Sequence, residues 1–178
     1  MKNTFILSLL FFCISSAASA QHRWEDIPLI KVSDFEAEVP EDAWMPIYIN
    51  SRIYYRIDTV IEKRRSYRVG IRTTVEMQKN ESFWDHEKVK PKDEARMLEH
   101  EQGHLYLAYI AANSIEKDML KHKFTENWKE EVRSKFHELL ERHYNEYLIY
   151  DKETRHGNDI KNQKKWNDWF KWMLTAVK

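Results

Sequence analysis

His100-Glu101-Gln102-Gly103-His104 lies within a long segment, residues 93–112, whose apolar side chains recur at helical spacing. Residues four apart lie on one face of a helix, so His100 and His104 can approach a common metal ion. Glu101 lies beside that face, where a carboxylate can accept a proton from a water molecule. The pattern predicts a helix with a metal site, for which zinc is the expected ion and Glu101 the expected general base.

Two features distinguish this segment from a charged surface helix, which could carry the same histidines without any ligand. Residues 105–112, which follow the motif, are almost all apolar, and this favours a buried helix over a solvated one. Gly103 costs a helix interior about 1 kcal/mol relative to alanine. We therefore expect another group to approach the backbone closely at Gly103.

The start of the chain, residues 1–20, has the features of a signal peptide. An apolar run at 5–14 precedes small residues at 18–20, a typical cleavage site. We expect the chain to be exported to the periplasm or the medium, and residues 21–178 to form a single domain. Cys13 is the only cysteine and falls inside the leader. Any metal site in the expected mature chain must therefore use His, Asp and Glu.

The overall composition sets limits on the partners. The 29 basic residues balance the 29 acidic ones, so no net field favours nucleic acid or an anionic membrane surface. No segment is apolar for long enough to predict an integral membrane segment. We expect a peptide or protein substrate as the partner, and the sequence sets no oligomeric state.

Extended patterns fill the first half of the chain and helical patterns the second. Residues 47–57 and 67–77 are rich in β-branched and aromatic side chains, and the second run alternates as a half-buried antiparallel strand does. Its edge could accept an extended peptide. The predicted fold class is α+β, with a small N-terminal antiparallel sheet followed by a zincin-like helical part. Three main helices are expected, at about 91–121, 128–150 and 159–175, with a break at 122–127.

The antiparallel packing of the first two predicted helices determines where a third metal ligand is expected. A short turn between two long helices makes them antiparallel, and this returns residues 151–157 to the level of His100. A catalytic zinc usually has three protein ligands and one open position. We favour His156 as the third ligand, because imidazole suits zinc and Gly157 would let the chain turn directly after it.

Other residues of this segment remain open as alternatives. Asp151 is the second choice for the third ligand and Glu153 the next. Asp151 could instead hold a ligating histidine through its free ring nitrogen. Thr154, or His156 if it does not bind the metal, could stabilise an oxyanion.

A second histidine-rich segment does not fit a metal site in the same way. His137 and Glu141 are four apart on the second predicted helix, but His143 is turned away from their face by the helical period. We interpret His137 and Glu141 as part of a solvated helix face.

Several landmarks, spread over almost the whole expected mature chain, resemble the bacterial "domain of unknown function 922" family, which is regarded as secreted zinc peptidases of zincin type. They are Asp34-Phe35, Ser82-Phe83-Trp84, Leu98-Glu99-His100-Glu101-Gln102-Gly103-His104, Tyr150-Asp151-Lys152-Glu153-Thr154-Arg155-His156-Gly157, Gln163 and Trp166. Two positions depart from the family pattern: Phe83 separates a serine and a tryptophan that are adjacent in the family, and Leu105 stands where phenylalanine is usual. The resemblance implies a metallopeptidase-like domain.

We expect an exported zinc-dependent hydrolase, most simply a metallopeptidase. Zinc would lower the pKa of a water molecule, and Glu101 would accept the proton as that water attacks a polarised carbonyl. A zinc-dependent amidase acting on cell-wall peptide or another non-protein substrate would use identical residues. A non-catalytic binding protein with a structural metal site is a third alternative, against which the presence of Glu101 argues.

Overall fold

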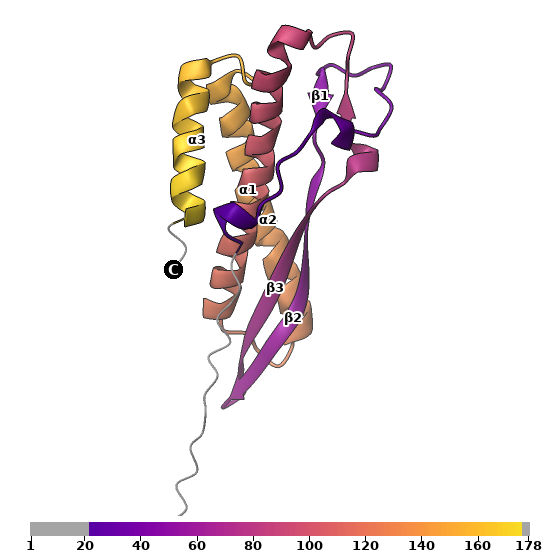
Figure 1. Cartoon of the computed structure of the whole chain (residues 1–178). Helices are drawn as coiled ribbons and strands as arrows, with labels where there is room; N and C mark the ends of the chain where they lie inside the picture. The colour runs from indigo at the N-terminus through magenta and orange to yellow at the C-terminus, as the bar shows by residue number, and fades with distance from the viewer. Residues whose placement is uncertain (1–21, 176–178) are drawn as a thin grey trace, which may run out of the picture.

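Two small antiparallel sheets and three long helices make up residues 22–175, which are the residues that the computed structural model describes (Figure 1). This architecture confirms the predicted α+β fold class, whereas the expected signal peptide, residues 1–20, lies outside the described residues. The strands are β1 (Ile47–Tyr48), β2 (Ser51–Lys63), β3 (Ser66–Met77) and β4 (Phe83–Trp84). The helices are α1 (Glu94–Lys121), α2 (Trp128–Thr154) and α3 (Ile160–Thr175).

The first predicted strand, 47–57, is divided between two sheets. β1 pairs antiparallel with β4, whereas β2 pairs antiparallel with β3, so the chain changes partner at residues 49–50. Asn50 supports this change, because its N–H donates to Ser82 Oγ and its carbonyl accepts the N–H of Gln78. Periodicity alone could not find this change of partner, because both parts have the same extended pattern.

The second predicted strand agrees closely with β3. Its inward positions, Val69, Ile71, Thr73 and Val75, are buried, and this face packs on α1. β2 continues to Lys63 and is joined to β3 by Arg64-Arg65, both of which have positive φ. Positive φ at both central residues is what a two-residue hairpin turn of type I′ requires. Arginine is an uncommon residue in such a turn, so the residue types at positions 64 and 65 do not predict a hairpin.

The two longest helices, α1 and α2, are antiparallel and lie beside the β2–β3 ribbon, with α3 packed against both (Figure 1). α1 follows a short 3-10 turn at Pro91–Asp93, close to the predicted start of the helix. α2 ends at Thr154, four residues later than predicted, and Arg155 closes it with a left-handed conformation at φ 51°. The longer helix places Asp151 on its last turn, which faces α1.

The central part of α1 is enclosed on nearly all sides, since every residue from 100 to 113 is buried. One apolar cluster joins α1, α2, α3 and the N-terminal segment, and includes Leu105, Tyr150 and Phe170. A second cluster lies between β3, α1 and α2, and includes Val69 and Phe136. Because α1 contributes to both clusters, the helix that carries the motif is the central element of the packing.

Within residues 22–175, no helix combines the length and the apolar character that crossing a membrane requires.

Candidate metal centre

Three side chains from two helices bring potential ligand atoms together. His100 and His104 come from α1, and Asp151 comes from the last turn of α2. Asp151 Oδ1 lies 3.1 Å from His100 Nε2 and 2.9 Å from His104 Nε2. The three ligand atoms all lie within 4.8 Å of one another. They form the only such group of His, Cys, Asp or Glu found in the described part of the chain.

This donor set fits zinc. Ligand atoms bonded to a tetrahedral zinc at about 2.0 Å are about 3.3 Å apart, close to the two distances from Asp151. Two imidazoles and one carboxylate are nitrogen and oxygen donors of the kind that zinc binds. Three protein ligands would leave one position of a tetrahedral site open, as in catalytic zinc sites.

The arrangement favours Asp151, the second choice from the sequence, over His156. The His156 side chain is 55% exposed, and its Nδ1 lies 3.6 Å from Asp151 Oδ1. His156 has a left-handed backbone, with φ at 51°, and its ring lies edge-on to the exposed ring of Trp44. It therefore lies at the rim of the site, beside the three ligand atoms.

The remaining candidates from the 151–157 segment have other contacts. Glu153 points toward α3, where its carboxylate accepts a hydrogen bond from Trp166 Nε1 at 2.9 Å. Thr154 is fully buried and its hydroxyl donates to the carbonyl of Tyr150 at 2.7 Å. The same hydroxyl lies 3.4 Å from His100 Nδ1. Thr154 therefore lies on the Nδ1 side of the His100 ring, where it supports the imidazole. It does not lie beside the position that a substrate would take.

Two glycines permit the close packing that positions His100. A Cβ on Gly103 would lie 2.1 Å from the hydroxyl oxygen of Tyr150, so only glycine lets that ring reach α1. Tyr150 uses the approach to donate a hydrogen bond to the carbonyl of His100 at 3.0 Å. A Cβ on Gly157, where φ is 75°, would lie 2.8 Å from the Cβ of His100. Gly157 thus makes room for His100, which is a different role from aiming His156.

Gln163 on α3 fixes the proton of the His100 imidazole. Its amide nitrogen donates to Tyr150 Oη at 2.7 Å and to Asn167 Oδ1 at 3.0 Å, so its oxygen faces His100 Nδ1 at 3.2 Å. An amide oxygen only accepts, so the imidazole N–H is on Nδ1 and the lone pair of Nε2 faces Asp151. Two electron pairs 3.1 Å apart repel unless a proton or a metal cation lies between them.

The second imidazole is held by aromatic packing. The His104 ring stacks on Tyr147 at 5.4 Å between centroids, with an angle of 20° between the planes. It lies edge-on to Tyr150 at 5.0 Å. These rings restrict the orientation of His104 without using its ligand atom.

Asp151 is a carboxylate at neutral pH. Burial disfavours its charged form, but the hydrogen bonds and positive charge that His100 and His104 supply when they are protonated outweigh burial and hold the pKa of Asp151 well below its usual range. A ligand must be deprotonated to bind a metal. Asp151 therefore meets this requirement across the whole neutral range.

Glu101 is buried at the floor of the site, with 5% of its surface exposed. Burial raises the pKa of its carboxyl to about 7, against the opposing influence of His100, and Asp151 adds a smaller upward contribution. No side chain in residues 22–175 donates a hydrogen bond to this carboxylate. A largely buried carboxyl without such a partner favours its neutral form, and a pKa near 7 suits a group that exchanges protons.

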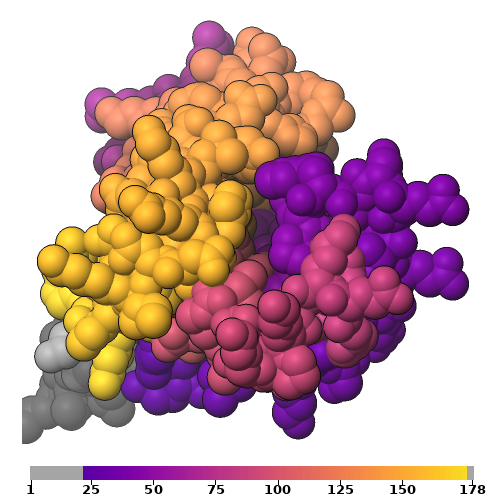
Figure 2. All heavy atoms as spheres, turned by 90° about the horizontal axis from the view of Figure 1, so that it is seen from above, coloured from indigo at the N-terminus to yellow at the C-terminus, as the bar shows by residue number. Residues whose placement is uncertain are grey.

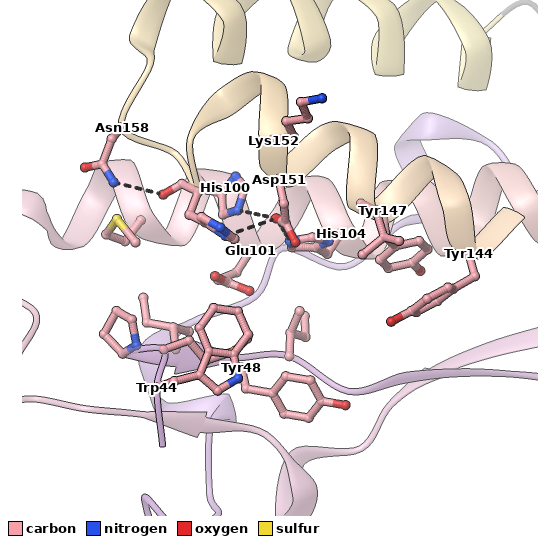
Figure 3. Close-up of a pocket in the computed structure, with 17 residues that line it drawn as sticks. Trp44, Tyr48, His100, Glu101, His104, Tyr144, Tyr147, Asp151, Lys152 and Asn158 are labelled. Atoms are coloured by element: carbon pink, nitrogen blue, oxygen red, sulfur yellow. Dashed lines mark hydrogen bonds and ion pairs between the residues drawn. The ribbon is translucent and has the colours of Figure 1, made fainter. Parts of the chain in front are cut away.

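The side chains of His100, His104 and Asp151 line a cleft of about 730 Å³. Figure 2 shows this cleft from above as a hollow beside the violet N-terminal part of the chain. The cleft runs between α2 on one side and residues 44–49 on the other, with α1 as its floor (Figure 3). β1 therefore lines the cleft, whereas the strand expected to accept a peptide, 67–77, packs on α1 away from it.

Some residues of the centre were not found from the sequence. Gln163 was a family landmark without an assigned role, and Tyr147 and Tyr144 carried no signal apart from their aromatic character. His137 and Glu141 are exposed as expected, and His143 is turned inward and buried. The four-residue spacing was enough to predict that His100 and His104 share one face, because both belong to one helix.

Comparison with known proteins gives one match. Residues 47–157 match the family described as "Bacterial protein of unknown function (DUF922)". No curated protein and no solved structure matches the chain. The matched region covers more than half of the chain, from β1 through His100 and His104 to Gly157 beside His100. The chain therefore belongs to the DUF922 family of bacterial proteins.

Proposed function

We propose that this protein is an exported zinc-dependent hydrolase that cleaves amide bonds in peptides. His100, His104 and Asp151 would hold the metal, and Glu101 would be the general base. Zinc in this group would polarise a substrate carbonyl and lower the pKa of a water molecule. The single observation that carries the proposal is the combination of three converging ligand atoms with a buried, unpartnered carboxyl beside them in an open cleft.

Each neighbouring residue has a distinct role in the proposed reaction. Glu101 accepts the proton of the attacking water and passes it to the leaving amine. His156, half exposed at the rim and close to Asp151, is positioned to donate a hydrogen bond to the oxygen on which negative charge develops. Gln163 and Thr154 keep the His100 ring in place.

Glu101 also separates this proposal from a structural metal site. A site that only stabilises the fold is usually closed by four protein ligands. Here three ligand atoms converge, from His100, His104 and Asp151, and the carboxylate of the neighbouring Glu101 is not among them. An amidase acting on cell-wall peptide would use the same residues, so only the substrate separates these two hydrolases.

The test uses the mature protein loaded with zinc. Metal content is measured by atomic spectrometry, and cleavage of a mixed peptide pool and of cell-wall peptide fragments is followed by mass spectrometry. We expect Glu101→Gln to retain one zinc per chain and to lose about 10²–10⁴-fold in rate.

The matched control is Glu99→Gln, which changes an exposed carboxylate two residues away on α1 and should retain both zinc and rate. Cleavage by Glu101→Gln at the wild-type rate would refute the assignment of the base. Absence of zinc-dependent cleavage in both substrate pools would refute the proposed hydrolase.

A further inference from the structure

One end of the cleft is lined by a row of aromatic rings that starts at a metal ligand. Tyr147 stacks on His104, and Tyr144 lies beyond it, with 6.5 Å between the two tyrosine ring centroids and 20° between their planes. Figure 3 shows this order along α2, with Tyr48 approaching from β1 on the opposite side. This row of rings therefore forms a continuous wall that leads away from the candidate metal group along α2.

The side chains at this end expose much of their apolar surface. Tyr144 is 62% exposed, Leu148 52% and Tyr48 41%, although all three line the concave cleft. Exposed apolar groups that gather in a concavity mark a ligand-binding surface more often than an accident of the surface. We call Tyr48, Tyr144 and Leu148 the apolar subsite.

Charge is unevenly distributed along the cleft. The carboxylates of Glu101 and Asp151 are at the metal group, and the apolar subsite itself contains no charged side chain. Lys152 also lines the cleft, but it lies one turn of α2 beyond Leu148, next to Asp151 and outside the apolar subsite. A charged substrate side chain would therefore lose water in the apolar subsite without gaining a partner.

The shape of the opposite wall favours an extended peptide. β1 has a strand neighbour, β4, on one edge only within residues 22–175. An extended peptide can add to the other edge of β1, and its alternate side chains then point to one face. One such side chain would reach the apolar subsite while the adjacent carbonyl lies over Glu101.

We propose that the apolar subsite selects peptides with a large uncharged side chain, aromatic or aliphatic, on one fixed side of the bond that is cleaved. This specificity rests on the proposed function, because it assumes that the bond to be cleaved lies at the metal group. It rejects aspartate, glutamate, lysine and arginine at the same position.

The experiment measures binding separately from cleavage. Zinc-loaded Glu101→Gln is titrated calorimetrically with blocked hexapeptides of alanine and serine, in which one position at a time is Phe, Leu, Asp or Lys. At one position, we expect Phe and Leu to bind at least about tenfold tighter than Asp and Lys. Adding Tyr144→Ala should reduce this preference to less than about threefold.

The matched control is Tyr54→Ala, which removes a tyrosine that is 43% exposed on β2 outside the cleft and should leave the preference unchanged. Equal binding of all peptides, no binding of any, or a preference that Tyr144→Ala leaves intact would overturn the inference. Cleavage of the same peptides by the wild-type protein is scored separately. The preference without cleavage would contradict only the hydrolase, and cleavage without the preference would contradict only the apolar subsite.

Discussion

Replacing Asp151 by alanine tests the composition of the metal centre most directly. Asp151 Oδ1 lies 3.1 and 2.9 Å from the Nε2 atoms of His100 and His104, so its loss leaves two ligands where three converge. We expect Asp151→Ala to weaken zinc binding more than about 100-fold, beyond the range typical of residues that only support a ligand. His100→Ala and His104→Ala should have the same effect.

His156→Ala should behave differently. The His156 ring is 55% exposed and 3.6 Å from Asp151 Oδ1, so solvent screens its interaction with the carboxylate. Such exposed pairs contribute about 0–1 kcal/mol, which corresponds to at most about a fivefold change in zinc affinity. The two variants therefore differ by more than an order of magnitude in their expected effects.

The assay is a thermal unfolding series at increasing zinc concentration. A ligand at 100 times its dissociation constant stabilises the folded state by about 2.7 kcal/mol. For a domain of this size, 1 kcal/mol raises Tm by about 2–4 °C, so saturating zinc should raise the wild-type Tm by about 5–11 °C. Asp151→Ala should lose this rise and His156→Ala should keep it.

His137→Ala is the control for adventitious binding, because it removes an exposed histidine from the same helix. The reverse result, with zinc stabilisation lost in His156→Ala and kept in Asp151→Ala, would refute the geometric assignment and restore the ligand favoured by the sequence.

Three further predictions concern the surroundings of the centre. Gln163→Leu removes the acceptor for His100 Nδ1 and should lower zinc affinity about 10–100-fold in a competition titration; an unchanged affinity would show that the imidazole needs no such support. Gly103→Ala gains about 1 kcal/mol of helix propensity, but overpacking should reduce stability by about 1–3 kcal/mol net in urea unfolding. Gly70→Ala is its control, since a Cβ there meets nothing closer than 3.5 Å. Asp34 has a pKa lowered chiefly by the hydrogen bond from Lys79, so it stabilises the fold above pH 3.8 and loses this contribution as pH falls through its folded pKa. The stability difference between the wild type and Asp34→Asn should therefore be largest near pH 7 and shrink in acid, and a difference independent of pH would contradict this.

Local sequence was enough to predict the helix with His100 and His104, and the alternating strand that became β3. Both depend on periodicity within one element: 3.6 residues per turn places residues four apart on one face, and a period of two separates the buried and exposed faces of a strand. The need for glycine at position 103 was also visible, because glycine is unfavourable in a helix unless something lies against it. These features follow from neighbours along the chain.

The choice of Asp151 as the candidate third ligand, and the cleft itself, came only from the tertiary structure. Asp151 and His156 differ by five residues, and the end of α2 determines which of them faces α1. That end depends on the left-handed turn at residues 155–157 and on the room that Gly157 leaves for His100. The ring of Tyr144 and the strand β1 meet across the cleft although nearly a hundred residues separate them in the chain. Such contacts depend on how whole elements pack, and no local period in the sequence encodes them.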